Sequence, residues 1–243
     1  MLKNKIKKLL LIFQTYDYFM AFVRFGISAG IENINVLNYL LFNDFQTVVD
    51  VGSNRGQFAL VARRYFPKAK IVSFEPLKEP AVLFRRLFAT DSRVFLHEIA
   101  IGPDEKEMTI HVSRKDDSSS LLPITDLQNS LFQGTSEREI HTVQVKPLAR
   151  VLSPEDIKSP ALLKMDVQGY EKEALEGCRA LMPLFSHIYV ECSFVELYAG
   201  QSFAHEVISF LSEFGFVLCG VYNLCYDKKG MTIQGDFLFN KNI

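Results

Sequence analysis

The chain has no excess of either charge, because 27 lysines and arginines stand against 28 aspartates and glutamates in its 243 residues. A protein that binds nucleic acid usually carries a basic excess or a basic stripe, and this sequence has neither. We therefore expect no nucleic-acid partner, and we favour a small or neutral molecule as the substrate.

Cysteine is scarce, and the cysteines present form no C-x-x-C pair and have no histidines at zinc-site spacing. They are Cys178, Cys192, Cys219 and Cys225. A disulfide framework is typical of small secreted domains, and structural zinc needs paired cysteines or histidines. The sequence therefore predicts reduced thiols and no metal site.

No apolar run is long enough for a signal peptide or a membrane span. Four lysines among residues 3–8 precede the run Leu9–Phe13, but Gln14 and Thr15 end it after five residues. A signal peptide needs about 7–15 apolar residues and a membrane span about 20. We expect a cytoplasmic protein with no transmembrane segment. The basic N-terminus leaves peripheral membrane contact open, and a helix packed on the domain is favoured.

Short β-branched runs alternate with segments of helical periodicity, which predicts a doubly wound α/β fold. The expected strands are Thr47–Val51, Ala69–Phe74, Arg93–Ala100, Ala161–Met165 and His187–Cys192. The expected helices are Gln57–Phe66, Lys78–Phe88, Glu171–Leu181 and Phe203–Phe214. Two more strands, Phe216–Tyr222 and Asp236–Phe239, have no helix between them. The sequence thus predicts a seven-stranded, mostly parallel Rossmann-like sheet with one antiparallel strand near the C-terminus.

Two segments lie outside this alternation. Residues 1–43 read as an N-terminal helical extension with breaks at Gly26 and Gly30, and its apolar face is compatible with a homodimer. Residues 44–243 form the main domain. It carries a β-insertion around residues 101–150, in which two strands flank a polar loop near residues 115–120.

The most informative segment is residues 50–56, Asp-Val-Gly-Ser-Asn-Arg-Gly, which leave the first strand and open a helix. A glycine turn there lets a ligand approach free backbone N–H groups. The sequence has no P-loop motif, and Ser53 and Asn54 stand where a dinucleotide site would have its second glycine. Asp50 would repel a diphosphate and attract an ammonium or a sulfonium. These features predict S-adenosylmethionine as the cofactor.

A carboxylate stands at the end of the second strand, in Phe74-Glu75-Pro76, about twenty residues after the glycine turn. At that position a carboxylate accepts hydrogen bonds from ribose hydroxyls. The predicted cofactor-binding residues are Asp50, Gly52, Ser53, Asn54, Gly56, Gln57, Glu75, Pro76, Ala100 and Asp166.

The sequence resembles the FkbM-like methyltransferases, a branch of the class I S-adenosylmethionine-dependent enzymes. The matching blocks are residues 50–56, 74–76, 163–171, 191–194 with Tyr198, and 234–239. The pattern Lys-x-Asp-x-Gln-Gly-x-Glu at 164–171 is the part specific to this family. The resemblance implies O-methylation of a hydroxyl, often in a sugar, glycan or natural product. Such sequences often carry Thr-Leu-Asp before the fourth strand, where residues 146–150 read Lys-Pro-Leu-Ala-Arg, so no role is carried over to that segment.

Three carboxylates are the predicted catalytic residues: Asp166, Glu191 and Glu171. Asp166 ends the fourth strand and Glu191 the fifth, so both should face the crevice at the carboxyl edge of the sheet. Asp166 is the best candidate to lie near the methyl group and the acceptor hydroxyl, with Glu191 as a second base or an acceptor contact. Glu171 has an equal structural alternative beside a helix N-terminus. A divalent cation held by the first two is open but not favoured.

Other polar residues are weaker candidates. Gln168 and Tyr198 suit the wall of an acceptor pocket, and residues 118–120 suit a lid. His111 and His141 are minor alternatives for the base.

Three other functions compete with this interpretation. An NAD-dependent oxidoreductase would need a different glycine spacing. A non-catalytic S-adenosylmethionine-binding protein would not need Asp166 and Glu191. A nucleic-acid methyltransferase would be expected to carry an Asn-Pro-Pro-Tyr or Asp-Pro-Pro-Tyr motif, which is absent.

Overall fold

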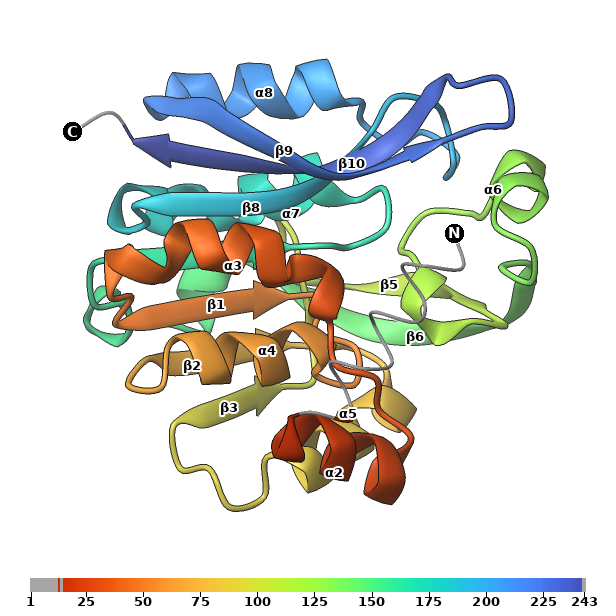
Figure 1. The fold of residues 1–243 in the computed structure, drawn as a ribbon. Coiled ribbons are helices and arrows are strands. Elements are labelled where there is room, and N and C mark those ends of the chain that lie inside the picture. Colours follow the sequence, from red (N-terminus) through yellow and green to blue (C-terminus); the bar gives the residue numbers. More distant parts are fainter. Residues whose placement is uncertain (1–12, 14, 242–243) are drawn as a thin grey trace.

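A seven-stranded sheet forms the centre of the computed structural model, which describes residue 13 and residues 15–241 (Figure 1). Its strands are β1 (Thr47–Val51), β2 (Lys70–Phe74), β3 (Val94–His97), β7 (Ala161–Met165), β8 (His187–Ser193), β9 (Phe216–Tyr226) and β10 (Thr232–Lys241). Their order is β3-β2-β1-β7-β8-β10-β9. β10 runs antiparallel to both β8 and β9, and all other neighbouring strands in this sheet are parallel. The predicted fold class is therefore confirmed.

Helices cover both faces of this sheet, as the doubly wound pattern predicts. The α-helices are α2 (Tyr16–Phe25), α3 (Ile34–Leu40), α4 (Gln57–Tyr65), α5 (Lys78–Leu87), α6 (Asp126–Leu131), α7 (Glu171–Cys178) and α8 (Ala204–Glu213). Short 3-10 helices lie at Ile31–Asn33, Leu41–Asn43, Asp116–Ser118, Leu148–Arg150, Pro154–Asp156 and Arg179–Leu184. Residues of α2 to α5 share one core cluster, and residues of α7 and α8 share another.

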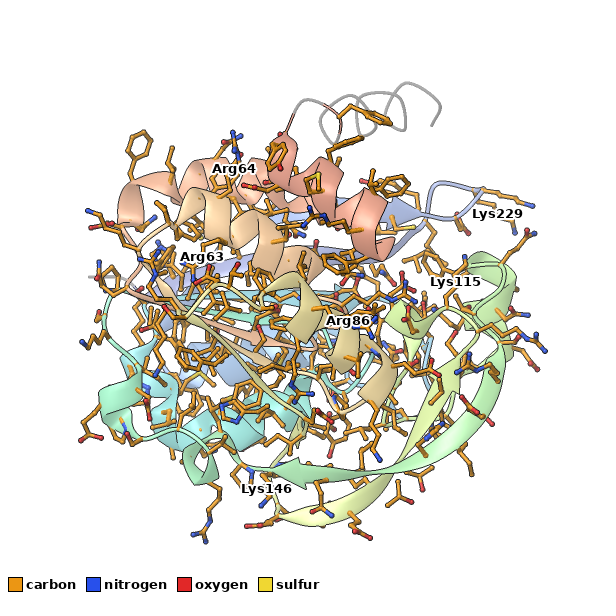
Figure 2. All side chains as sticks on the ribbon, turned by 90° about the horizontal axis from the view of Figure 1, so that it is seen from below. Arg63, Arg64, Arg86, Lys115, Lys146 and Lys229 are labelled. Atoms are coloured by element: carbon orange, nitrogen blue, oxygen red, sulfur yellow. The ribbon has the colours of Figure 1, made fainter. Side chains whose placement is uncertain are left out.

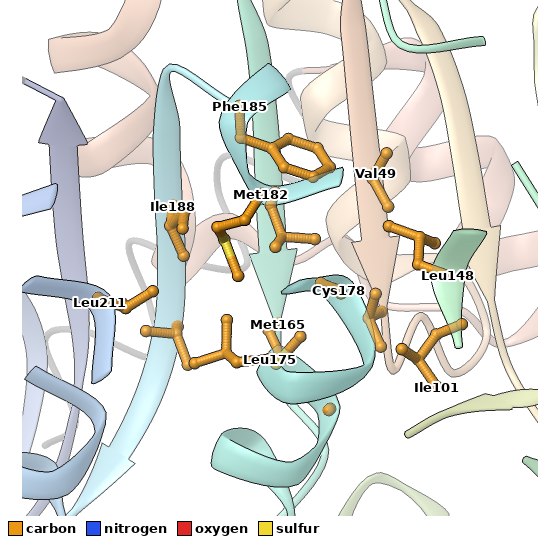
Figure 3. Close-up of a cluster of buried hydrophobic side chains, with 14 of the residues drawn as sticks. Val49, Ile101, Leu148, Met165, Leu175, Cys178, Met182, Phe185, Ile188 and Leu211 are labelled. Carbon is orange, nitrogen blue, oxygen red and sulfur yellow. The ribbon is translucent and has the colours of Figure 1, made fainter. Parts of the chain in front are cut away.

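The central strands are buried on both faces, which explains their nearly continuous apolar runs. In β1, Val49 belongs to the cluster under α7 and α8, whereas Val48 belongs to the cluster under α3 and α4. Leu163 and Leu162 alternate in the same way in β7. Figure 3 shows the first cluster, where side chains of α7 meet the central strands. The sheet therefore positions its strand ends rigidly.

The predicted insertion folds as a second sheet beside the carboxyl ends of the central strands (Figure 1). Its strands are β4 (Ala100–Ile101), β5 (Lys106–Ser113) and β6 (Glu137–Lys146), in the order β4-β6-β5. The expected strand Arg93–Ala100 is divided between β3 and β4, because the chain leaves the central sheet after His97 and pairs with β6 instead.

Other boundaries also differ from the sequence prediction. The helix expected to reach Leu181 ends at Cys178 and continues as a 3-10 helix that contains Pro183. β9 and β10 form a hairpin. β9 continues to Tyr226 and β10 begins at Thr232, so both strands are several residues longer than their apolar runs indicate. The β9 part of this extension has no buried side chain, and half-buried and buried residues alternate in the β10 part, so the apolar signal is weak.

The N-terminal helices pack on the main sheet. Tyr18 and Ala21 of α2 and Leu37 and Leu40 of α3 are buried in the same cluster as Val48 of β1. No helix in the described part of the chain is long and apolar enough to cross a membrane. The basic segment before α2, for which membrane contact was left open, lies outside the described residues. The dimer face stays a prediction.

Basic side chains come from many elements. The six lysines and arginines labelled in Figure 2 lie on α4, α5, β6, the segment after β5 and the β9–β10 turn, and only Arg63 and Arg64 of these six share an element.

Gly177 in α7 tests how closely the insertion approaches this helix, which packs on the main sheet. A Cβ atom at this position would lie 2.4 Å from the carbonyl oxygen of Gly102. Although alanine favours helix formation, we expect Gly177→Ala to lower the free energy of unfolding by about 1–3 kcal/mol through overpacking. Urea denaturation measures this loss.

The neighbouring substitution Glu176→Ala is the control, because it removes only a surface ion pair with Arg179 and should cost less than about 0.5 kcal/mol. An increase in stability from Gly177→Ala would contradict the close approach.

Candidate active site

A cavity of about 510 Å³ opens at the carboxyl ends of β1, β2, β7 and β8, where ligands bind in doubly wound sheets. The insertion covers it, since residues 115–121 line one side together with Gln128 and Phe132. Arg55 in the glycine turn forms an ion pair with Asp116 of this cover at 2.7 Å. The cavity therefore lies between the central sheet and the insertion.

The glycine turn brings the ends of β1 and β7 together. Gly52 has a φ of +77°, and a Cβ atom there would lie 1.8 Å from the carbonyl oxygen of Asp166. The backbone N–H groups of Gly52 and Ser53 both donate to the carbonyl oxygen of Phe74 at 3.0 Å. Only glycine fits this crossing of three strand ends.

Glu75 holds the same turn from the end of β2. Its carboxylate accepts hydrogen bonds from the N–H groups of Asn54 at 2.9 Å and Leu77 at 2.8 Å. The side chain is 5% exposed and lines the cavity. Burial raises the pKa of Glu75 to about 7. A buried hydrogen-bond acceptor thus stands in the wall where the sequence places a ribose contact.

Most of the predicted cofactor-binding residues line the cavity. These are Gly52, Ser53, Asn54, Gln57, Glu75, Pro76, Ala100 and Asp166. Gly56 lies behind the turn, where a Cβ atom would meet the rings of Phe84 and Phe88 at 2.9 and 2.8 Å. Asp50 also lies outside the lining.

Asp50 is placed differently from the expectation that it meets the ligand's cation. It is 0% exposed, and its cation is Lys164, whose Nζ lies 3.4 Å from the carboxylate. Asp50 and Lys164 are register partners in β1 and β7, so their side chains point the same way. The neighbouring parallel strand β7 thus supplies the cation for the Asp50 carboxylate. Asp50 is therefore a buried structural partner of Lys164.

Lys164 also lines the cavity, and the sequence analysis left it without a role. Its Nζ donates to the carbonyl oxygen of Gly52 at 3.3 Å and lies 3.7 Å from the Asp166 carboxylate. Burial opposes its charge, but the carboxylates of Asp50 and Asp166 outweigh this effect and raise the pKa of Lys164. A lysine inside the apolar strand Ala161–Met165 was the available signal.

Asp166 and Glu191 both line the cavity, as the sequence predicts for two strand-end carboxylates. The Gln168 amide donates to both, at 2.7 Å to Asp166 and 2.8 Å to Glu191. Gln234 donates to the second oxygen of Glu191 at 2.7 Å. Burial and the negative charges of Asp166 and Asp236 raise the pKa of Glu191 well above its usual range.

Asp236 adds a carboxylate that had no predicted role. It accepts hydrogen bonds from the Tyr189 hydroxyl at 2.8 Å and the Asn223 amide at 2.7 Å, and it lines the cavity. Burial raises the pKa of Asp236 to about 6. Its position opposite Glu191 follows from the β8–β10 register, which the sequence alone does not reveal.

Glu171 lies behind the site. It does not line the cavity, and its carboxylate accepts hydrogen bonds from the N–H groups of Val167 at 3.2 Å and Gly169 at 3.1 Å. Burial, followed by the charge of Asp166, raises the pKa of Glu171 to about 7. The placement matches the structural alternative for this residue, since Glu171 fixes the loop that carries Gln168.

The weaker candidates separate into two groups. Residues 118–120 and Gln168 line the cavity, and the buried Tyr198 donates to Gln168 at 2.6 Å. His111 and His141 do not line it and lie beside Glu137 and Glu139 on the insertion. In the described part of the chain, no three His, Cys, Asp or Glu side chains are grouped so that they could hold a metal ion.

Comparisons with known proteins agree on one family. Residues 50–218 match the family model described as the methyltransferase FkbM domain. The 2-O-methyltransferase NoeI of Sinorhizobium fredii is 27% identical over 179 residues, which cover 70% of this chain and 72% of that protein. Methyltransferase 1 of Beauveria bassiana is 29% identical over 148 residues, which cover 56% of this chain and 59% of that protein.

Solved structures are more distant. The precorrin-6y C5,15-methyltransferase of Geobacter metallireducens has a TM-score of 0.48 and 11% identity, with 86% of this chain and 87% of that chain covered. The magnesium protoporphyrin IX methyltransferase of Synechocystis, solved with bound SAM, has a TM-score of 0.48 and 10% identity, with 87% and 81% covered.

The crossing at Gly52 is testable by substitution. We expect Gly52→Ala to lower the free energy of unfolding by at least about 2 kcal/mol more than Gly215→Ala, measured by denaturant titration. Gly215 is a matched control because its φ is +78° and a Cβ atom there would meet no atom within 4 Å. Equal losses in the two variants would show that backbone strain alone matters at Gly52.

The pKa of Glu171 gives a prediction of pH dependence. Its pKa is about 7 in the folded protein and near 4.5 when unfolded, so the folded state binds the proton more tightly. The wild type therefore loses stability as pH rises from about 4.5 to 7. The free energy of unfolding of Glu171→Gln, relative to that of the wild type, should therefore rise by about 3 kcal/mol between pH 4 and pH 8.

Unfolding free energies at both pH values measure this difference. Glu176→Gln is the control, because the ion pair with Arg179 lowers the pKa of Glu176 and its difference should be small and of opposite sign. A pH-independent difference for Glu171→Gln would contradict the burial of this carboxyl.

Proposed function

The chain belongs to the FkbM methyltransferase family, and we propose that it uses S-adenosylmethionine to methylate a hydroxyl group of a sugar, glycan or natural product. When bound, this cofactor supplies a methyl group on a positively charged sulfur, whose bond breaks with the electron pair left on sulfur. The protein then has to align the acceptor, exclude water and take the hydroxyl proton. The observation that carries the proposal is one cavity lined both by the glycine turn with Glu75 and by the carboxylates of Asp166 and Glu191. We assign the first group to the cofactor end and the second to the acceptor end.

The first end of the cavity suits an adenosine. Glu75 offers a buried acceptor for ribose hydroxyls, as in other doubly wound nucleotide sites. Leu77, Ile99 and Ala100 provide apolar walls beside it, and the volume of about 510 Å³ is in the range of small-ligand sites. Lys164 lies further in, beside the glycine turn, where we assign it to the cofactor's carboxylate. These residues fit S-adenosylmethionine.

The second end suits an acceptor with a hydroxyl group. We assign Asp166 and Glu191 to the contact with this hydroxyl and to acceptance of its proton, because both line the cavity and no histidine does. A carboxyl with a raised pKa is a better base near neutral pH than an ordinary one. The hydroxyl as acceptor group is supported by the 2-O-methyltransferase among the relatives, at 27% identity.

The competing functions have less support. A dinucleotide-binding sheet commonly has the order 3-2-1-4-5-6 with all strands parallel, whereas here the antiparallel β10 lies between β8 and β9. A purely binding protein would have no use for paired carboxylates at the second end. We see no specific observation that favours either function. The proposed reaction includes no divalent cation.

Calorimetric titration with S-adenosylhomocysteine, and in parallel with NAD, tests the cofactor. We expect micromolar affinity for S-adenosylhomocysteine and a loss of about tenfold to a hundredfold in Glu75→Gln, because a hydrogen bond to a charged group is lost. Glu79→Gln is the control, since Glu79 is an exposed carboxylate four residues away on α5.

Binding of NAD without binding of S-adenosylhomocysteine would overturn the proposal. Unchanged affinity in Glu75→Gln would overturn the assignment of the ribose contact.

A further inference from the structure

Gln168 lies between the two carboxylates of the acceptor end and touches both. Its Nε2 donates one hydrogen to Asp166 Oδ1 at 2.7 Å and the other to Glu191 Oε2 at 2.8 Å. Two carboxylates held this close repel each other. An amide that donates to both offsets the repulsion, because each hydrogen bond has a charged acceptor.

The orientation of the Gln168 amide is fixed from its other end. Tyr198 donates its hydroxyl hydrogen to Gln168 Oε1 at 2.6 Å, so the NH₂ group is left to face the carboxylates. Gln128 of the insertion lies next in the chain of contacts and donates to the Tyr198 oxygen at 3.3 Å. The reverse orientation would place an amide oxygen against two carboxylates.

The backbone around Gln168 is also held from several sides. Gln168 has a φ of +54°, which is costly for a residue with a side chain. Its carbonyl oxygen accepts from Ser120 Oγ at 2.6 Å, and Glu171 binds the N–H groups on both sides of it. A Cβ atom at Gly169 would lie 2.9 Å from the Tyr198 ring, so glycine is required there. The surroundings keep an unfavourable backbone in place.

We propose that Gln168 is a positioning residue that holds the Asp166 and Glu191 carboxylates together at the acceptor end of the cavity. The shared amide donor keeps both groups close together, where a carboxylate oxygen would accept the proton of the acceptor hydroxyl. Tyr198 acts through Gln168 by fixing the amide. This inference rests on the proposed function, since the two carboxylates need a common target only if an acceptor lies there.

The titration of the two carboxyls reports on this role without a known acceptor. Carbon-13 NMR of side-chain carboxyls follows each group with pH, and Asp166→Asn and Glu191→Gln identify the two signals. The groups that act on Glu191 are the carboxylates of Asp166, Asp236 and Glu171 and the ammonium of Lys164. The polar surroundings of Glu191 also include Gln168, Gln234 and Tyr198. Each variant below changes one residue and keeps the others.

Gln168→Met removes the shared donor and keeps the length of the side chain. We expect it to raise the pKa of Glu191 by about one unit and to shift the carboxyl signal of Asp166 as well, because each carboxylate loses a hydrogen bond. Gln234→Met should raise chiefly the pKa of Glu191, the only one of the two carboxylates that Gln234 contacts. Gln128→Met is the matched control, since it is a buried residue of the same network that touches neither carboxylate.

Tyr198→Phe provides a second variant if Gln168→Met does not fold. It frees the amide without touching the carboxylates and should shift both signals in the same direction by less. If both signals titrate in Gln168→Met as they do in the wild type, Gln168 does not position the pair. The same conclusion holds for Tyr198→Phe if that variant has to replace Gln168→Met. Equal shifts in Gln128→Met would assign the effect to general loosening and overturn the proposal as well.

Titration of the same variants with S-adenosylhomocysteine separates this inference from the proposed function. Gln168→Met should bind it within about twofold of wild type, because Glu75 and the glycine turn are unchanged. If the wild type does not bind it while both carboxyl signals still shift, the proposed function fails and the contact of Gln168 with the two carboxylates stands.

Discussion

The buried ammonium group of Lys164 forms contacts between the two central strands, β1 and β7, at the edge of the sheet where the cavity opens. Its Nζ lies between the carboxylates of Asp50 and Asp166 and contacts the carbonyl oxygen of Gly52. Asp50 has no access to water, so without this cation its charge would be uncompensated in the interior, at a cost of several kcal/mol. The end of β1 and the end of β7 are thereby fixed relative to each other.

The two ends of the cavity follow from that junction. Gly52 approaches the Asp166 backbone from one side and leads to the turn that Glu75 holds. Asp166 leads from the other side to the loop that carries Gln168, and from there to Glu191 on β8. A small shift of β1 against β7 would move both ends at once. The same interaction that stabilises the sheet therefore sets the distance between the cofactor end and the acceptor end.

The insertion adds a cover whose attachments reach both ends. Arg55 pairs with Asp116 beside the glycine turn, whereas Ser120 donates to the carbonyl oxygen of Gln168 at the acceptor end. A cover tied at two points is suited to excluding water from the space between them.

Much of this architecture was predictable from the sequence because it depends on local patterns. The strand runs, the glycine turn and the carboxylates at strand ends mark their own positions, and Glu75, Asp166 and Glu191 line the cavity as expected. Contacts that depend on strand register were not predictable. Asp50 faces Lys164, and Asp236 lies opposite Glu191, only because β7 pairs with β1 and β10 with β8. The role of Glu171 was ambiguous, since the sequence is the same whether this carboxylate lies at a helix N-terminus or in the wall of the cavity.

The most direct test of the central claim is a crystal structure of the protein with S-adenosylhomocysteine. The account predicts that the ribose contacts Glu75 and that the sulfur points toward the space between Asp166 and Glu191. A ligand bound with its ribose away from Glu75, or with its sulfur turned away from the two carboxylates, would contradict the division of the cavity into a cofactor end and an acceptor end.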